Sequence, residues 1–404
     1  MTEKQLIIKQ YQDEVEQELD NILNFWTENT YDEKNGGFIG KMDINGQIDY
    51  TAPKGLVLNA RILWTFSAAY KNSRKAAHLA AAQRAYAALL FHFKDNEYGG
   101  YYWSIQPNGD PLSMRKQIYG LAFTLYGLSE FYAISKGTDV KNECIRIFNW
   151  IEKHSFNPKN KGYLEAVARD GSPLDDMRLS PKDRNDPLSM NTHLHILEAY
   201  TNLYRIWQGD FLKQQMENLI DIFLEKIISK SRHLILFFDE NWQATDTEIS
   251  YGHDIEAAWL VLEAAEVVGY KVMETKQIAV EIAHAASKGL DTEGGLDYEK
   301  KRPERHWWVQ AEAMVGFLNA YELSNESHFL DKSVACWHFT KKYLIDPVNG
   351  EWFWGYTSEG RLMRDEDKVG FWKCPYHNAR ACMEVSRRLK KIENFTFIPP
   401  VLHL

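Results

Sequence analysis

The sequence predicts an all-α fold, an (α/α)6 barrel in which six inner and six outer helices form two concentric rings. The first observation is a set of six mostly small and apolar segments, each interrupted by a few polar residues: 54–61, 117–126, 191–198, 252–256, 306–312 and 372–380. A helix that is apolar nearly all round is buried, and buried polar groups are costly unless they are paired or used. Six such segments, recurring at roughly sixty to seventy residues, indicate an inner ring whose polar residues line one shared cavity.

The second observation is a repeated pattern of glycine and aromatic residues between the helical segments. It occurs at 35–38, 98–103, 161–163, 294–298 and 349–354, and most copies are followed by a second turn that ends in glycine. Two turns flanking a short aromatic run are typical of a small β-hairpin, in which glycine supplies the positive φ. We expect a further copy at 237–240 that has lost its glycines, and we expect the hairpins at one end of the barrel.

The third observation is a set of amphipathic, charged segments, as at 5–28, 74–92 and 211–230, which predict the outer helices. The order of charged helix, hairpin and buried helix recurs six times, and short connections such as 71–73 favour antiparallel neighbours. An open α-solenoid has the same kind of period. The hairpins and the convergent polar residues favour a closed ring. Because no linker rich in proline, glycine or serine divides the chain, we expect one catalytic domain over residues 1–404.

The composition argues against several classes of function. The net charge is −9 and no basic stretch is long enough to follow a phosphate backbone, so we expect no nucleic-acid partner. No apolar signal core precedes residue 10, and no uncharged apolar run reaches the roughly 18 residues that span a bilayer. The four cysteines lack metal-site spacing and suit a reducing compartment. We therefore expect a soluble, cytoplasmic protein without a membrane partner and, in the absence of a long heptad pattern, a monomer.

Histidines and carboxylates three residues apart stand out in the buried segments. His253 and Glu256 share one face of a predicted helix, and His195 and Glu198 repeat that spacing. A carboxylate beside an imidazole orients the ring and raises its basicity. Between the neighbouring His193 and His195, we select His195, because it lies one turn after Asn191 on the same face and pairs with Glu198.

Two more buried segments contribute candidates of their own. His377 opens the last inner segment, and Arg61 lies in an otherwise apolar stretch. Trp307 and Trp308 are adjacent, so they point about 100° apart on a helix and cannot fill the same seam. We expect at least one of them to face the cavity.

Other interpretations of these residues remain open. A single buried histidine is often a core residue, and the two histidine–glutamate pairs can be structural hydrogen bonds. Histidine and glutamate also bind divalent ions. No third and fourth ligand lies at a characteristic spacing, so we expect no metal and no cofactor.

The arrangement resembles the N-acylglucosamine 2-epimerase superfamily, and most closely its cellobiose 2-epimerase branch. The resemblance rests on segments 54–66, 191–200, 251–263, 305–313 and 371–380, and it extends over essentially the whole chain in matching order and spacing. It implies an (α/α)6 barrel, which agrees with the repeat. It also implies an isomerase that interconverts cellobiose and 4-O-β-D-glucosyl-D-mannose, with lactose and its epimer as further substrates, through ring opening and an enediolate.

The resemblance also implies roles for individual residues. The family's three histidines match His195, His253 and His377, its histidine-paired carboxylate matches Glu256, and its inner-helix arginine matches Arg61. Its stacking tryptophans match Trp308 and Trp372, with Trp307 adjacent. We add three further candidates for substrate binding, which are Asn191, Asp183 and Tyr119.

The chemistry suits these residue types. Removing a proton from C2 of the open sugar and returning one to its other face needs two groups that titrate near neutral pH, as histidine does. An arginine can stabilise the enediolate. The alternatives are an N-acylglucosamine 2-epimerase or a mannose isomerase of the same superfamily. A glycoside hydrolase using carboxylates such as Asp183, Asp186, Glu256 and Glu312 is a different class of enzyme with this fold. A sugar-binding module without activity remains the last alternative.

Overall fold

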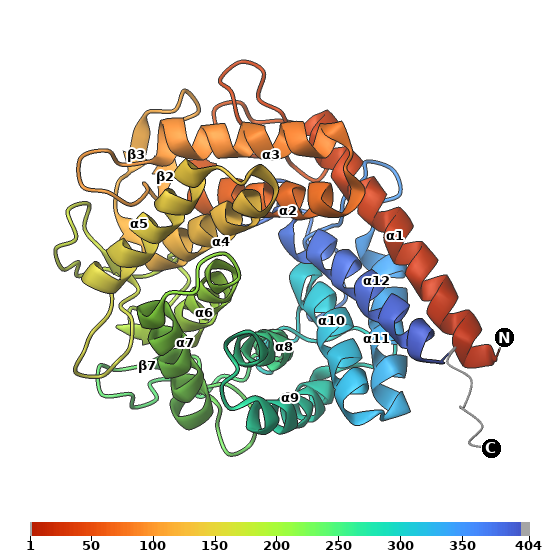
Figure 1. The fold of residues 1–404 in the computed structure, drawn as a ribbon. Helices are drawn as coiled ribbons and strands as arrows, with labels where there is room; N and C mark the ends of the chain where they lie inside the picture. The colour runs from red at the N-terminus through yellow and green to blue at the C-terminus, as the bar shows by residue number, and fades with distance from the viewer. Residues whose placement is uncertain (1, 397–404) are drawn as a thin grey trace, which may run out of the picture.

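A computed structural model describes residues 2–396, with side chains through residue 393, and they form two concentric rings of helices (Figure 1). Each inner helix touches the next, and the last, α12, touches the first, α2, so the ring closes. The predicted barrel is therefore confirmed, and the open solenoid is wrong. The inner helices are α2 (Leu56–Ser73), α4 (Ile118–Ser135), α6 (Met190–Tyr204), α8 (Tyr251–Val268), α10 (Trp307–Ser324) and α12 (Tyr376–Thr396).

The outer helices alternate with the inner ones along the chain and cover them. They are α1 (Glu3–Asn29), α3 (Ala76–Ala88), α5 (Thr138–His154), α7 (Asp210–Ile222), α9 (Val272–Ala286) and α11 (Ser327–Phe339). Three of them continue into a π-helical turn, at Leu89–Phe93, Phe223–Ile227 and Thr340–Leu344, and α9 continues into a 3-10 turn at Ser287–Gly289. Helix α1 packs against α12, which brings the two ends of the described chain together (Figure 1).

Tight reversals join each inner helix to the outer helix that follows it. Helices α2, α4, α8 and α10 each end at a residue in the left-handed conformation, with φ of 57°, 55°, 72° and 60° at Arg74, Lys136, Gly269 and Asn325. A left-handed residue lets its backbone N–H close the last turn, so the chain reverses at once. The predicted antiparallel neighbours follow from these short reversals.

The inner helices approach one another closely because glycine lies at their contacts. A Cβ at Gly127 of α4 would lie 2.6 Å from the carbonyl oxygen of Ala60 in α2, and one at Gly316 of α10 would lie 2.6 Å from the carbonyl oxygen of Ile255 in α8. Those distances are too short for any side chain. The apolar residues that flank these positions form one continuous core between the two rings.

Short strands link successive repeats at one end of the barrel. A strand of two residues precedes an inner helix and pairs antiparallel with a strand of the next repeat. The strands are β1 (Lys54–Gly55), β2 (Ser104–Ile105), β3 (Pro111–Ser113), β4 (Lys116–Gln117), β5 (Ala166–Val167), β6 (Leu188–Ser189), β7 (Phe237–Phe238), β8 (Arg305–His306) and β9 (Gly355–Tyr356). An additional bridge between Met42 and Val369 joins the last repeat to the first, and it closes this end of the barrel as well.

Hairpins are present in all six repeats, but the fourth is closed at 228–234 and not at the predicted 237–240, and it shows how the pattern survives without glycine. Equivalent backbone bridges close the turns, such as Tyr31 with Phe38 and Lys94 with Tyr101. In the fourth repeat the bridge joins Ile228 and Leu234, and Arg232 takes the left-handed conformation with φ of 66°. The segment predicted at 237–240 enters the second turn of this repeat, where Trp242 has φ of 61°.

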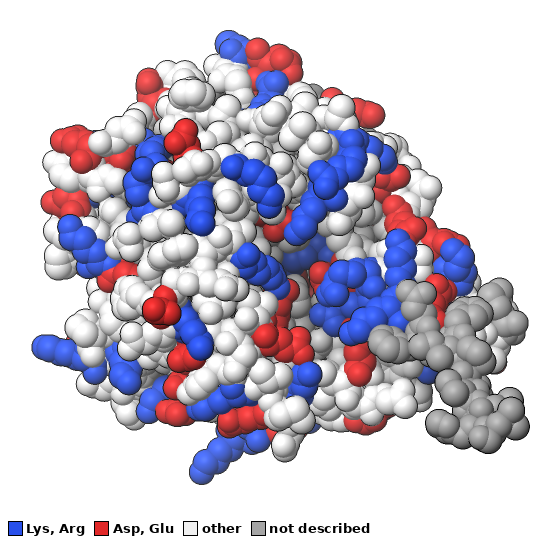
Figure 2. Space-filling view, in the orientation of Figure 1, with Lys and Arg blue, Asp and Glu red and all other residues white. Residues whose placement is uncertain are grey.

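Two further features concern the surface of the molecule. No helix within residues 2–396 is both long enough and apolar enough to cross a membrane. Acidic and basic side chains are interspersed over the face shown in Figure 2.

Candidate active site

The candidate residues converge at the N-terminal ends of the inner helices. These ends follow the short strands, so they all lie at the hairpin end of the barrel. The first and second turns of successive inner helices carry Arg61, Tyr119, His195, His253, Trp308 and His377. Because the N-terminus of a helix carries a partial positive charge and unpaired N–H groups, this end of the ring favours an anionic species.

His195 forms the pair that its spacing predicts. Its Nδ1 lies 2.8 Å from Oε2 of Glu198, and both side chains are buried. Burial lowers the pKa of His195, although Glu198 acts in the opposite direction. The ring is therefore neutral at pH 7, and its Nδ1–H donates to the carboxylate. The edge of Tyr119 packs against it, with ring centroids 4.9 Å apart.

Both ring nitrogens of His193, the neighbouring histidine, are hydrogen-bonded to backbone atoms. Its Nδ1 lies 2.6 Å from the carbonyl oxygen of Ser189, and its Nε2 accepts the backbone N–H of Tyr163 at 3.0 Å. Both ring nitrogens are used, so His193 holds a hairpin onto α6. The geometry therefore favours His195 over His193 as the third histidine of the site.

His377 has a carboxylate partner that its own sequence segment does not contain. Its Nδ1 lies 2.7 Å from Oε1 of Glu312, which projects from the preceding inner helix, α10. Burial lowers the pKa of His377 to about 3, with Glu312 opposing the shift and Arg61 and Arg380 reinforcing it. With Nδ1–H donated to Glu312, the free Nε2 is the basic atom.

His253 is held by a hydroxyl group. Its Nδ1 lies 2.8 Å from Oγ of Ser250, the residue that caps the N-terminus of α8, and that hydroxyl also lies 3.4 Å from the carbonyl oxygen of Tyr298. Burial, together with the nearby His195 and His377, lowers the pKa of His253 to about 3. The three histidines are therefore close enough to influence one another, as a shared site requires.

The predicted pairing of His253 with Glu256 is wrong. Although the two residues are three apart on α8, Glu256 points deeper, where its Oε1 lies 3.3 Å from Nη2 of Arg380. The hydroxyl of Ser250 is nearer to the imidazole because the cap folds back over the first turn of the helix. The same spacing on α6 does produce a pair, so spacing alone does not decide the partner.

Arg380 joins three glutamates beneath the histidines. It contacts Glu198 directly, and its Nη2 lies 2.6 Å from Oε1 of Glu312. Burial alone would raise the pKa values of Glu198 and Glu312, but Arg380 and the paired histidines lower both to about 2. Burial and the charge on Glu312 raise the pKa of Glu256 well above its ordinary value. Glu256 is therefore the carboxyl group of the cluster that is most easily protonated.

Arg61 is aimed at the upper part of the same site. Its Nη2 donates to the hydroxyl of Tyr119 at 2.8 Å, and its guanidinium lies over the rings of Phe123 and Tyr376, 4.1 Å and 4.9 Å from their centroids. The aromatic faces support the buried charge. Arg61 Nε has no hydrogen-bond partner among the described residues.

The tryptophans separate into two groups. Trp308 contacts two histidines, with its ring 5.0 Å from that of His253 and 5.6 Å from that of His377. Trp372 lies 6.0 Å from Tyr119, at the edge of the same group. Trp307 has a different neighbour, since its ring packs at 4.4 Å against that of Trp354. The sequence argument that the adjacent pair diverges is confirmed.

The remaining candidates lie around the rim. Asn191 is in the first turn of α6, and its buried Oδ1 accepts no hydrogen bond from any described residue. Asp183 lies in the loop before β6, where it accepts the backbone N–H of Ser180 at 2.8 Å, and its charge reaches Tyr298 beside His253.

One group in the site has donors of the kind that bind metals. Ligand atoms of Glu256, Glu312 and His377 lie within 4.8 Å of one another. The guanidinium of Arg380 is already bound to this group, and a cation would have to displace it. The donor set therefore suits an internal ion pair better than a divalent ion.

Comparison with known proteins shows the family of the chain. The profile of the N-acylglucosamine 2-epimerase (GlcNAc 2-epimerase) family matches residues 37–381. The chain belongs to this family. A cellobiose 2-epimerase of Bacteroides fragilis is 47% identical over 389 residues, which cover 94% of this chain and 98% of that protein.

Solved structures of epimerases share the whole fold. The cellobiose 2-epimerase of Spirochaeta thermophila superposes with a TM-score of 0.92 at 38% identity, over 97% of this chain and all of that one. The corresponding enzyme of Bacillus thermoamylovorans gives 0.91 at 38% identity, over 94% and 100%. The likeness thus extends over the barrel and the hairpins together.

Several residues of this candidate site were not predicted from the sequence. Glu312 and Arg380 lie in apolar segments that it singled out, but neither was given a role with the histidines. Arg380 follows His377 by three residues, so it shares a helix face, and this signal was available. The partnership of Glu312 with His377 joins two helices, and no spacing within one helix reveals it. Ser250 had no signal beyond its position as a helix cap.

Proposed function

We propose that this protein is a cellobiose 2-epimerase, which interconverts cellobiose and 4-O-β-D-glucosyl-D-mannose and also acts on lactose. The observation that carries the proposal is the position of two buried histidines, His253 and His377, close to the same tryptophan, Trp308. The similarity to cellobiose 2-epimerases over nearly the whole chain supports it. Residues 1–404 act as one catalytic domain, a cytoplasmic monomer that needs no cofactor.

The reaction begins with opening of the reducing-end ring. A proton leaves the O1 hydroxyl and O5 gains one as the C1–O5 bond breaks, which produces an aldehyde at C1. His195 has a basic Nε2 backed by Glu198, and it serves this transfer. The aldehyde acidifies the proton on C2, because the resulting charge spreads onto O1.

Two histidines then exchange the proton on C2. His377 removes it with Nε2, the C–H electrons form the C1=C2 bond, and the carbonyl electrons move to O1. His253 takes up a proton from solvent and, as an imidazolium, returns a proton to the opposite face of C2 while the C1=O bond forms again. His377 then releases the proton it removed to solvent, which restores both neutral rings. The enediolate beside His253 favours its imidazolium form, and the roles are exchanged in the reverse direction. The carboxylate of Glu312 stabilises the imidazolium of His377.

The charge of the enediolate needs fixed donors in a low-dielectric site. Arg61 is permanently charged, and its contact with Tyr119 directs both groups toward the histidines. The N-terminal ends of the inner helices add partial positive charge at the same place. Burial and the charge on Glu312 raise the pKa of Glu256, which disfavours a further negative charge near O1.

The rim binds the sugar. Trp308 and Trp372 offer flat faces to the apolar sides of the sugar rings. The unpaired Oδ1 of Asn191 accepts a sugar hydroxyl, which satisfies an atom that is otherwise buried without a partner. Asp183 supplies an acceptor from the loop at the edge of the site. Trp307, whose ring packs against Trp354, borders this part of the site next to Trp308 in the chain.

A glycoside hydrolase is disfavoured by the positions of the carboxylates. Such an enzyme needs two carboxyl groups facing the scissile bond. Glu198, Glu256 and Glu312 are buried beneath the histidines and bound to Arg380. Asp186 is paired with Arg184 at 2.7 Å in the outer loop. No pair of carboxylates among the described residues is both free and close to the histidines.

The experiment that tests the proposal is product analysis with separate substrates. The purified protein is incubated with cellobiose, with mannose and with N-acetylglucosamine, and the products are identified by NMR. Cellobiose should give 4-O-β-D-glucosyl-D-mannose. Fructose from mannose, with cellobiose unchanged, would identify a mannose isomerase. Turnover of N-acetylglucosamine alone would identify the other branch of the family.

A further inference from the structure

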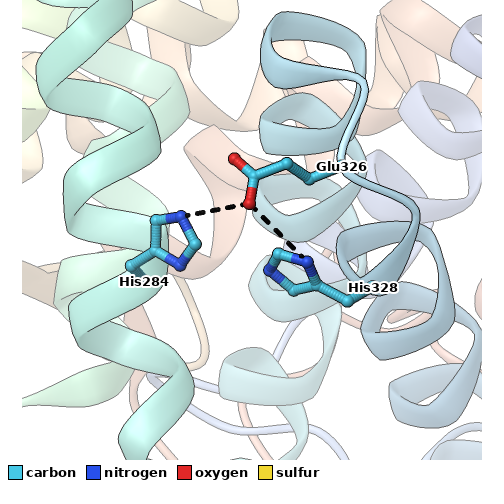
Figure 3. A group of neighbouring side chains, drawn as sticks. All are labelled: His284, Glu326 and His328. Atoms are coloured by element: carbon cyan, nitrogen blue, oxygen red, sulfur yellow. Dashed lines mark ion pairs between the residues drawn. The ribbon is translucent and has the colours of Figure 1, made fainter.

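Two histidines and a glutamate meet on the outer surface of the barrel, remote from the inner helices that carry the active site. His284 projects from α9, and Glu326 and His328 lie at the start of α11 (Figure 3). Nε2 of His284 lies 3.6 Å and Nδ1 of His328 lies 3.7 Å from the same oxygen, Oε2 of Glu326. Ligand atoms of all three lie within 4.8 Å of one another.

These separations suit a bound cation better than direct hydrogen bonds. A hydrogen bond between an imidazole and a carboxylate spans about 2.7–3.2 Å, which both contacts exceed. Zn²⁺ holds nitrogen and oxygen ligands at about 2.0–2.2 Å in a tetrahedron, so its ligand atoms lie about 3.4 Å apart. The two printed distances, 3.6 Å and 3.7 Å, are therefore within a few tenths of an ångström of that geometry.

The scaffold holds the three side chains in place. Glu326 is the residue immediately before α11, and its carbonyl accepts the backbone N–H of Phe329 at 3.1 Å. The buried ring of Phe329 packs against both imidazoles, with centroids 4.7 Å from His284 and 4.3 Å from His328. The ligand side chains are 41–47% exposed, so a cation can enter from solvent.

The donor chemistry selects the kind of cation. Two imidazoles and one carboxylate suit borderline transition-metal ions, whereas Mg²⁺ and Ca²⁺ prefer oxygen ligands throughout. Unlike the group around His377, this one contains no arginine among its described ion pairs. Three protein ligands leave the fourth position of a tetrahedron for water.

We propose that His284, Glu326 and His328 bind one Zn²⁺ ion, which clamps α9 to α11 on the outside of the barrel. The site is separate from the catalytic residues, and it does not depend on the proposed function. Because the ion binds the folded chain and joins two helices, it stabilises the protein by mass action.

Zinc titration of the protein without a histidine tag tests the proposal. Zn²⁺ is added in competition with a chromogenic chelator to the wild type, His284→Gln, His328→Gln and His338→Gln. The last variant removes an exposed histidine farther along α11 and is the matched control. We expect the wild type and the control to bind one Zn²⁺ ion at this site. His284→Gln and His328→Gln should bind it more than about tenfold less tightly, since even groups that only orient metal ligands contribute about 10–100-fold to affinity.

Two further readouts separate this site from the histidines of the active site. Zn²⁺ should raise the melting temperature of the wild type and of the control, but not that of His284→Gln or His328→Gln, and Mg²⁺ should produce no difference. Without added metal, His284→Gln should retain wild-type epimerisation of cellobiose. Identical zinc titrations for all four proteins would overturn the proposal, as would an equal rise in melting temperature.

Discussion

His253 and His377 contact the same tryptophan, Trp308, but differ in what holds them. The Nδ1 of His377 is bound to a carboxylate, Glu312, whereas the Nδ1 of His253 is bound to the hydroxyl of Ser250. Burial lowers the pKa of each to about 3. A buried anion stabilises an imidazolium and a hydroxyl does so only weakly, so the two histidines are unequal as bases. The difference suggests a division of labour, with His377 the better acceptor of a proton and His253 the better donor.

Removing either histidine should have the largest effect. His253→Ala and His377→Ala should each lower kcat for epimerisation by about 10²–10⁴, because each removes the proton transfer on one face of C2. The remaining histidine should still exchange the C2 proton of one epimer with solvent, without inversion, which NMR in heavy water can follow. Substantial epimerisation by either variant would show that the wrong histidine has been assigned.

The partners of the two histidines should differ in importance. Glu312→Gln should lower kcat by about 10–100-fold, because hydrogen bonds to charged groups contribute about 1.5–3 kcal/mol. Ser250→Ala should lower kcat by less than about tenfold, since a bond between neutral groups contributes about 0.5–1.5 kcal/mol. Rate profiles against pH for both variants supply the measurement. Equal losses of kcat in the two variants would contradict the proposed difference between His253 and His377.

Chelation should leave catalysis unchanged. If His377 and Glu312 transfer protons and hold charge, neither can serve as a permanent metal ligand. Exhaustive treatment with EDTA should therefore preserve the rate of cellobiose epimerisation, measured beside untreated enzyme. Loss of activity that manganese or zinc restored would reassign the group around Glu256, Glu312 and His377 as a catalytic metal site.

A further expected effect concerns stability against pH. The pKa of His253 is about 3 in the folded protein and about 6.5 in the unfolded chain, so the unfolded state binds more protons between these values. The free energy of unfolding should consequently fall as pH decreases from 6.5 toward 3. His253→Gln should reduce this slope in urea titrations at pH 7 and pH 5, while the surface variant His338→Gln should leave it unchanged. Equal slopes in all three proteins would contradict the low pKa.

The fold was predictable because its signals are local and repeated. Six buried segments, charged helices between them and hairpin turns each follow from short-range rules, and the ring follows from their number and order. The fourth hairpin shows the limit of the glycine signal, because Arg232 and Trp242 adopt the same backbone conformation. Packing elsewhere in the repeat compensates for the cost of positive φ at a residue with a side chain.

The site was predictable in its members but less so in their partners. Arg61, His195 and His377 could be identified because a polar residue in an apolar, buried helix is costly unless it is paired or functional. The His195–Glu198 pair followed from spacing, whereas the same spacing failed for His253 and Glu256. Partners that come from another helix, as Glu312 does for His377, depend on the curvature of the ring. That information is not contained in one helical period.

Incorporation of deuterium tests the central claim most directly. The enzyme is incubated with cellobiose in heavy water, and the products are examined by NMR at C2 of the reducing-end sugar. The account predicts that 4-O-β-D-glucosyl-D-mannose forms with solvent deuterium at C2, since the proton removed on one face is replaced on the other. Epimer without deuterium at C2 would contradict proton exchange through His253 and His377, and the absence of any epimer would contradict the proposed activity itself.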